Sequence, residues 1–254
     1  LGNGDYFIAE LDESDGTIEF YKPDISVITN LELDHPDHYV GGFDQLLNTF
    51  KNYIYNLHKE SKIIINADCE GNKKLLELIN HPGIILYSCN SDQIMYKNTA
   101  YTVKNILSKG LNSFAEVYKN KEYLGKIKLG VPGIHNISNA LATIAVAIEC
   151  GIDFSSIADS LARFTGMKRR FQILGSACGA KIVDDYAHHP TEVQATLKAA
   201  KEVINSADKG RVVAIFQPHR YTRLQNFWNE FVNSFNNADL VYVCDVYSAG
   251  DKPI

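Results

Sequence analysis

The chain has 254 residues, 45% of them hydrophobic and 22% charged, with a formal net charge of -5. This composition is typical of a soluble globular protein with two ordinary domains and excludes a disordered chain. No basic run is long enough to follow a nucleic-acid backbone, and no apolar run is long enough to cross a membrane. We therefore expect neither nucleic acid nor membrane as a partner.

The first third of the chain alternates strand-like and helix-like segments. A helix with one apolar face is predicted from Phe43 to Leu57, just after Gly41-Gly42. Strands are predicted over Tyr6–Glu10, Ile25–Asn30, Lys62–Asn66 and Ile84–Ser88. Such alternation predicts a parallel sheet with crossover helices packed on it.

The pattern changes over Tyr101–Lys128, where alternating segments are broken at Lys119-Asn120-Lys121. This pattern predicts a small antiparallel excursion with a hairpin. A helix is predicted from about Asn136 to Cys150, and Gly151 stands where a left-handed residue closes a helix. A shorter helix is predicted over Phe154–Phe164.

After Gly166 the strand–helix alternation restarts. Pro190 suits the first turn of a helix, because its missing N–H would have no partner there. The predicted elements are strands over Lys181–Asp185, Arg211–Phe216 and Leu240–Asp245, and helices from Pro190 and over Thr222–Phe235. The sequence thus predicts a second, doubly wound α/β domain, with a hinge near Gly166–Lys168.

Polar clusters follow several predicted strands, at the sheet edge where ligands bind in open α/β folds. The first contains Glu10, Asp12, Glu13 and Asp15, whose oxygens suit Mg²⁺, although a solvated acidic loop fits equally well.

The second cluster is Asp34-His35-Pro36-Asp37-His38. His35 and His38 would face one site if they began a helix. The same pattern also fits solvated histidines at a helix-start turn, or zinc ligation.

Two further clusters lie in the second domain. Asp184, Asp185, His188 and His189 follow one predicted strand, and His219, Arg220 and Arg223 follow the next. Cations there suit an anionic ligand, because Arg can grip a carboxylate or phosphate through two parallel hydrogen bonds. An exposed basic loop is the alternative, particularly for Arg223.

Two more groups of residues are candidates for nucleotide binding. Gly133-Ile134-His135-Asn136, with Asn139, opens a predicted helix; Asn136 either caps it or offers its amide to an adenine edge. Arg169 and Arg170 at the domain junction either place charge on a phosphate or form a solvated hinge.

The five cysteines, Cys69, Cys89, Cys150, Cys178 and Cys244, are odd in number, far apart and without a C-x-x-C pair. They favour neither a disulfide framework nor a zinc knuckle, so we expect a reducing, cytoplasmic location. The chain starts without an initiator Met and stops just after an apparent strand, and we expect both ends to be cut.

Together these strings resemble the Mur ligase family, most closely its alanine-adding branch, over nearly the whole chain. Three positions differ from the family's commoner residues, namely Pro36, His38 and Leu224, and His38 leaves the metal ligand set open. The matching strings are Glu10–Asp15, Thr29–Glu32 with Asp34-His35, Gly133–Asn136 with Asn139-Ala140, Arg169–Phe171, Asp184–Glu192, Phe216–Arg223 and Asp245–Gly250.

The resemblance implies the fold. Residues 1–167 would be the later part of a central Mur ligase ATPase domain, with a parallel sheet and the small antiparallel excursion. Residues 168–254 would be the first part of a C-terminal Rossmann-like ligase domain. The family's glycine-rich phosphate loop does not occur in this sequence and is expected before Leu1.

The resemblance also implies ATP and Mg²⁺ as cofactors and assigns roles to residues. Glu10 and His35 would hold the metal, and Arg170 would reach the phosphates. His135, Asn136, Asn139 and Asp185 would contact adenine and ribose. Tyr186, His188, His219, Arg220 and Arg223 would lie on the side of the two other substrates. Of all these, His35, Arg170, His188, His219, Arg220 and Arg223 are the expected catalytic residues.

The implied reaction is peptidoglycan precursor synthesis. ATP would phosphorylate the lactyl carboxylate of UDP-N-acetylmuramate, and the amine of L-alanine would displace the phosphate. Positioning and the charges of Mg²⁺ and Arg would supply most of the catalysis, without a covalent nucleophile.

Three alternatives remain. A ligase that reattaches a murein tripeptide in cell-wall recycling shares the fold. The chain could also be a non-catalytic ligand-binding module, because phosphate transfer has no cradle without the glycine-rich loop, and we expect the truncated chain to be inactive. A metal-dependent hydrolase built on the Asp and His clusters is the third.

Overall fold

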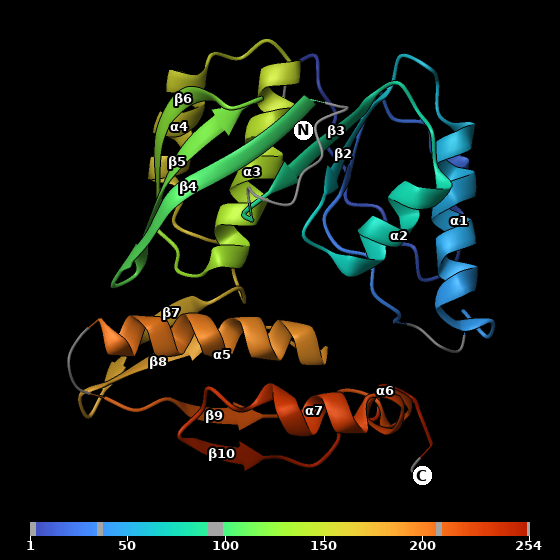
Figure 1. The fold of residues 1–254 in the computed structure, drawn as a ribbon. Helices are drawn as coiled ribbons and strands as arrows, with labels where there is room; N and C mark the ends of the chain where they lie inside the picture. The colour runs from blue at the N-terminus through green and yellow to red at the C-terminus, as the bar shows by residue number, and fades with distance from the viewer. Residues whose placement is uncertain (1–3, 35–37, 91–98, 207–209, 253–254) are drawn as a thin grey trace. The chain divides into compact units, whose positions relative to one another are not determined.

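The computed structural model describes residues 4–34, 38–90, 99–206 and 210–252 (Figure 1). By internal contacts the chain divides into two compact units, Leu1–Ile85 and Leu86–Ile254. Six strands follow one another in a single sheet in the order β1-β2-β3-β4-β5-β6, and two further sheets have two strands each. The α/β class predicted from the sequence is confirmed.

The first unit begins with a 3-10 helix, η1 (Thr17–Phe20). Its regular elements are β1 (Ile25–Ile28), α1 (Gly42–Asn56), β2 (Lys62–Asn66), α2 (Glu70–Leu78) and the start of β3 (Ile84–Ser88). β1 and β2 are parallel, with α1 in the connection between them, as the alternation predicts. The Tyr53 hydroxyl of α1 lies 2.9 Å from the Ser26 hydroxyl of β1, and both residues are buried. This contact joins the apolar face of α1 to the sheet.

Helix α2 lies very close to the carboxyl ends of β1 and β2. A Cβ on Gly71 would stand 1.9 Å from the carbonyl oxygen of Leu31, so only glycine fits there. The next residue, Asn72, has 0% exposure, and its amide nitrogen lies 3.0 Å from the Asn66 carbonyl oxygen and 3.3 Å from that of Thr29. This one side chain therefore ties both strand ends together.

The second unit starts with three antiparallel strands. They are β4 (Thr99–Lys109), β5 (Asn112–Lys119) and β6 (Glu122–Leu129). Asn120 and Lys121 have φ of 50° and 73°, the left-handed pair that a two-residue hairpin turn requires. The predicted hairpin is confirmed, and its strands belong to the six-stranded sheet.

Two helices pack against these strands. Helix α3 (Ile134–Glu149) contacts β4 and β5, and α4 (Phe154–Arg163) contacts β6. Gly151 has φ 81° just beyond α3, as predicted for the residue that closes this helix.

The rest of the second unit contains two small sheets. β7 (Gln172–Ala177) and β8 (Ala180–Asp184) are antiparallel, whereas β9 (Val213–Phe216) and β10 (Leu240–Val243) are parallel. The helices are α5 (Pro190–Asn205), α6 (Tyr221–Asn226) and α7 (Trp228–Ser234). The buried apolar core of this region consists of Val193, Leu197, Val212, Ala214, Phe216 and Phe231.

One predicted strand is absent, and another pairs differently from the prediction. Tyr6–Glu10 is not a strand, because no described strand pairs with it, and Phe7 and Ile8 are 84% and 89% exposed. The strand predicted over Lys181–Asp185 is present as β8, but it pairs antiparallel with β7 through the turn at Cys178 and Gly179, which both have positive φ.

One predicted helix also differs. The single helix predicted over Thr222–Phe235 is two, since the backbone leaves helical geometry at Phe227. The helix predicted just after Gly41-Gly42 is confirmed as α1, which begins at Gly42, so His38 does not begin a helix. No helix in the described part of the chain is long and apolar enough to cross a membrane.

Candidate functional site

The start of α5 is organised by the carboxylate of Glu192. Its Oε2 accepts hydrogen bonds from the backbone N–H of His188 at 3.0 Å and of His189 at 3.2 Å. His189 is the N-cap, Pro190 follows it, and the His189 and Glu192 side chains form a reciprocal capping box. These hydrogen bonds fix the backbone of the loop between β8 and α5 and keep His188 beside Glu192.

The same carboxylate also reaches the segment just before β7. Glu192 Oε1 lies 3.4 Å from Nη1 of Arg170, and the Arg170 guanidinium lies 5.9 Å from the centre of the Tyr186 ring. The Arg169 guanidinium lies over the same ring at 4.2 Å. Two exposed cations thus lie close to one aromatic ring, which is a geometry suited to an anionic ligand.

A chain of aromatic contacts continues from this ring. The Tyr186 ring meets the His188 ring edge-on at 4.9 Å, and the His188 ring meets that of His219 at 5.9 Å. The His219 ring stacks on Tyr247 at 5.6 Å. These contacts bring together side chains from the loops after β8, β9 and β10. The sequence had predicted polar clusters after the first two of these strands, but not after β10.

Arg223 contacts this chain of rings through His219. It is 5% exposed, and its Nη1 lies 3.0 Å from Nδ1 of His219. The exposed basic loop that the sequence allowed for Arg223 is therefore wrong, because α6 directs this side chain inward. Burial lowers the pKa of His219, the charges of Arg223, His188 and Arg220 add to this effect, and Asp251 opposes it. The ring is thereby favoured in its neutral form.

Arg220 adopts φ 68°, a left-handed conformation uncommon outside glycine. Its N–H donates to the Tyr247 carbonyl oxygen at 2.8 Å, which fixes the turn between β9 and α6. The Thr222 hydroxyl and N–H both donate to Asp251, at 2.8 and 3.2 Å. Arg220, at the N-cap of α6, is partly exposed next to His219.

Asp185 connects the end of β8 to Phe171, just before β7. Its two carboxylate oxygens accept the N–H groups of Phe171 and Ala187, each at 2.8 Å. The carboxylate is thus oriented by two backbone donors and is only partly buried, so its remaining lone pairs can accept from a ligand hydroxyl.

The start of α3 differs from the prediction for Asn136. Gly133, with φ 96°, is the N-cap of α3, and Asn136 lies within the first turn without capping it. Its amide instead donates to the Pro132 carbonyl oxygen at 2.7 Å and lies 3.1 Å from Nε2 of His135. Asn139 is exposed one turn further along.

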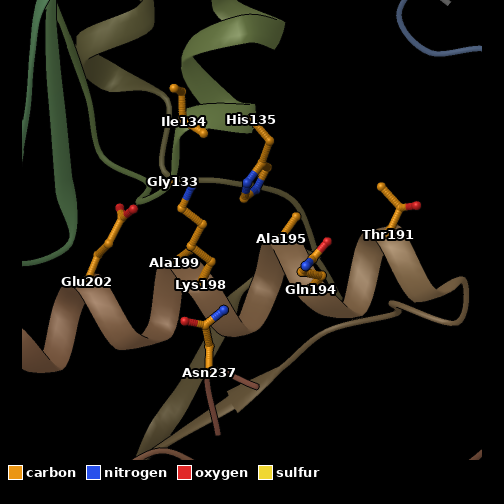
Figure 2. Close-up of a pocket in the computed structure, with 10 residues that line it drawn as sticks. All are labelled: Gly133, Ile134, His135, Thr191, Gln194, Ala195, Lys198, Ala199, Glu202 and Asn237. Carbon is orange, nitrogen blue, oxygen red and sulfur yellow. The ribbon is translucent and has the colours of Figure 1, made fainter. Parts of the chain in front are cut away.

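A pocket of about 330 Å³ lies between the start of α3 and one side of α5. Figure 2 shows the His135 ring directed toward α5, near Ala195. Burial lowers the pKa of His135, and the nearby carboxylates of Asp185 and Glu202 oppose that shift in part. Thr191, Gln194 and Lys198 supply polar groups along the α5 wall.

The acidic loop belongs to the first unit. Glu10 is exposed, Asp12 accepts from the Ser14 N–H at 2.8 Å, and Asp15 accepts from the Thr17 N–H at 2.9 Å. The Tyr39 hydroxyl donates to the Glu13 carbonyl oxygen at 2.5 Å; burial, then Glu13 and its acidic neighbours, raises the pKa of Tyr39 to about 12.

His35 lies outside the described residues, so its predicted place beside Glu10 stays a prediction. Among the residues that the structure does describe, no three His, Cys, Asp or Glu side chains gather as a metal site.

The structure thus brings Arg170, Tyr186, His188, His219 and Arg223 into one connected cluster of the second unit. Two further residues that contact this cluster, Glu192 and Tyr247, were not singled out individually from the sequence. Glu192 could have been found, since a Glu three residues after an N-cap and just after Pro190 is the signature of a capping box. Tyr247 carried no such signal, because its place depends on the pairing of β9 with β10.

Known proteins resemble this chain in both halves. The family model described as Mur ligase middle domain matches residues 2–147, and the one described as Mur ligase, glutamate ligase domain matches residues 169–253. The UDP-N-acetylmuramate--L-alanine ligase of Acaryochloris marina is 44% identical, over 98% of this chain and 51% of its own length. That of Gloeothece citriformis is 45% identical, over 100% of this chain and 49% of its own.

A solved structure is similar as well. The UDP-N-acetylmuramate-alanine ligase of Thermotoga maritima superposes with a TM-score of 0.73 at 30% identity, over 93% of this chain and 49% of its own. The chain therefore spans about half the length of the relatives that it matches.

Proposed function

The chain belongs to the Mur ligase family of ATP-dependent amide-forming ligases, and we propose that it forms part of an enzyme that joins L-alanine to UDP-N-acetylmuramate. ATP would activate the lactyl carboxylate as an acyl phosphate in peptidoglycan precursor synthesis. Relatives that carry the name of this activity match at about the same identity over the whole chain. We also propose a domain boundary between residues 167 and 168, a position supported by the separate family matches on either side.

One observation supports the proposal: several candidate side chains of the second unit are linked by contacts although they come from separate sequence motifs. Arg170, His188 and His219 are linked through Glu192 and through ring contacts. Acyl-phosphate chemistry requires two anionic substrates to approach each other, so a gathering of cations and hydrogen-bond donors is the equipment it needs.

Each residue has a role in this proposal. Arg169 and Arg170 would hold phosphate charge at the domain junction. His219 would present its Nε2–H as a neutral donor to a substrate oxygen, because Arg223 occupies Nδ1. His188, Tyr186 and Arg220 would line the same substrate side. Arg223 would act through His219, since it is buried and contacts that ring.

The nucleotide would be held at the other predicted residues. His135, Asn136 and Asn139 would contact adenine, with the Asn136 oxygen as the available end of its amide, because its nitrogen donates to Pro132. Asp185 would accept a ribose hydroxyl while the N–H groups of Phe171 and Ala187 keep the carboxylate in place.

For Mg²⁺, the exposed carboxylate of Glu10 is a suitable oxygen donor, and His35 is the proposed second ligand. Mg²⁺ commonly keeps several waters and needs only one or two protein ligands beside substrate phosphates, so a sparse set of residues fits it. When bound there, the ion would offset phosphate charge during the attack.

The test uses the complete gene product that contains these residues, assayed beside the 254-residue chain. We expect phosphate release only when ATP, Mg²⁺, UDP-N-acetylmuramate and L-alanine are all supplied, and no turnover from the chain alone. His35→Ala and Arg223→Ala should each lower kcat/KM on the order of 100-fold, the scale of a lost positioning or charged contact.

Three outcomes would overturn the proposal. Faster turnover with a murein tripeptide than with alanine would assign the recycling reaction. Phosphate release without any amino acid would indicate a hydrolase. Unchanged turnover in both variants would remove the assignment of the site.

A further inference from the structure

Resting on the proposed function, we infer that Glu192 is a positioning residue that sets the Arg170 guanidinium and the His188 side chain in one fixed arrangement. It would not touch a substrate itself. Its carboxylate would hold two catalytic groups from different strings, one at the domain junction and one after β8, at the spacing that the reaction needs.

The geometry assigns a separate task to each carboxylate oxygen. Oε2 accepts the backbone N–H groups of His188 and His189 and lies 3.4 Å from Nδ1 of His188. The same Nδ1 lies 2.9 Å from the Tyr186 carbonyl oxygen, so Glu192 and Tyr186 orient this ring together. Oε1 lies 3.4 Å from Nη1 of Arg170. One oxygen therefore caps α5 and orients His188, and the other holds the arginine.

The surroundings favour the ionised carboxylate. Burial alone would raise the pKa of Glu192, but the N–H of His188, the His188 ring, the N–H of His189 and Arg170 together hold it below its usual value. Near neutral pH the group is thus a permanent acceptor. It cannot donate a proton, so its contribution is orientation.

The two tasks can be separated by one substitution. In Glu192→Gln the amide oxygen can still accept the two backbone N–H groups, so the cap survives. The amide nitrogen then faces Arg170 as a donor against a donor, and the guanidinium is released. Glu192→Ala removes both tasks and would also weaken the start of α5.

The experiment measures kcat and KM of the complete gene product for wild type, Glu192→Gln, Arg170→Ala and the double variant. We expect Glu192→Gln to melt close to wild type but to lose kcat on the order of 10- to 100-fold, with a smaller change in KM for ATP. In the Arg170→Ala background the same substitution should have little further effect, because the group that it positions is gone. Glu230→Gln, another acidic residue in the first turn of a helix, is the matched control and should keep wild-type kinetics.

The results separate this inference from the proposed function. If wild type makes no product, the proposed function fails. If wild type is active and Glu192→Gln equals it, or if the effects of Glu192→Gln and Arg170→Ala simply multiply, Glu192 does not act through Arg170. If Glu192→Gln loses activity and its melting temperature also falls well below that of wild type, the role of Glu192 is capping alone and the inference is overturned.

Discussion

Buried Arg223 and partly buried His219 form a pair in which Nη1 of the arginine lies 3.0 Å from Nδ1 of the histidine. A guanidinium has donors but no acceptor, so Nδ1 must accept and the ring proton must stay on Nε2. The position of that proton follows from the pairing alone. A neutral ring with one defined donor is useful beside anionic substrates, because it can hydrogen-bond to an oxygen without adding a charge.

The pair predicts a spectroscopic result. The ¹⁵N spectrum of the His219 ring should show the Nε2–H tautomer at neutral pH. In Arg223→Ala the pKa of His219 should rise toward its ordinary value, because one of the positive charges that lower it is removed. A titration followed by NMR measures both effects. Arg223→Lys keeps the charge and should leave the pKa of His219 lowered, whereas an equal rise in both variants would contradict the charge argument.

The partly buried ring of His135 predicts a pH-dependent stability. Its pKa is lowered in the folded state, chiefly by burial, so below about pH 6.5 the unfolded chain binds a proton that the folded chain does not. The free energy of unfolding should therefore fall as pH drops from about 6.5 toward the folded pKa. His135→Gln should flatten this part of the profile in urea titrations, and Asn139→Ala, an exposed neighbour on α3, should not. Identical slopes for wild type and His135→Gln would rule out this coupling.

The sequence alone predicted the elements whose structure depends on a local residue pattern. Lys62–Asn66 and Ile84–Ser88 were predicted with the observed bounds, because a short apolar run of this length becomes a strand once neighbours cover it. Tyr6–Glu10 has the same pattern but no described pairing partner, so the prediction failed there. Strand β7 was missed because only Ile173 and Leu174 interrupt small and polar residues, and its ladder is irregular between Ile173 and Gly175.

The candidate site, too, was predictable from the sequence only in part. Motif strings identified Arg170, His188 and His219 as functional candidates, but not their partners. Glu192 contacts Arg170 across 22 positions of sequence, and burial of Arg223 depends on the inward direction of α6. The direction of a side chain depends on tertiary packing, and a local sequence pattern does not predict it.

Gly71 predicts a sharp steric effect in the first unit. Alanine is favoured over glycine in a helix by about 1 kcal/mol, yet a Cβ at position 71 would stand 1.9 Å from the Leu31 carbonyl oxygen. The clash involves backbone, so relief requires α2 or the loop after β1 to move, at a cost of about 1–3 kcal/mol or more. Gly71→Ala should lower the free energy of unfolding by a similar amount. Glu77→Ala, on the exposed side of the same helix, should be nearly neutral, and a stabilised Gly71→Ala would show that the approach is looser than described.

Asn72 gives the most specific prediction for the carboxyl ends of β1 and β2. Its side-chain nitrogen faces the carbonyl oxygens of Asn66, Thr29 and Ile28, at 3.0 to 3.4 Å, in a site with 0% exposure. Asn72→Ala removes the shared donor and should cost about 1–3 kcal/mol at any pH, because buried acceptors lose their partner. Asn72→Asp has the same shape but replaces the donor with an oxygen.

The two variants should therefore separate with pH. An ionised carboxylate at position 72 would face three carbonyl oxygens without a donor, so burial and repulsion should raise its pKa above the unfolded value of about 3.9. The folded chain then holds a proton that the unfolded chain has lost, and stability falls as pH rises through that interval. Relative to wild type at the same pH, Asn72→Asp should be mildly destabilised at pH 4.5 and strongly at pH 7.5 in urea titrations followed by circular dichroism. Equal losses at both pH values would mean that the position 72 side chain turns away from the strand ends, and that another group holds β1 and β2 together.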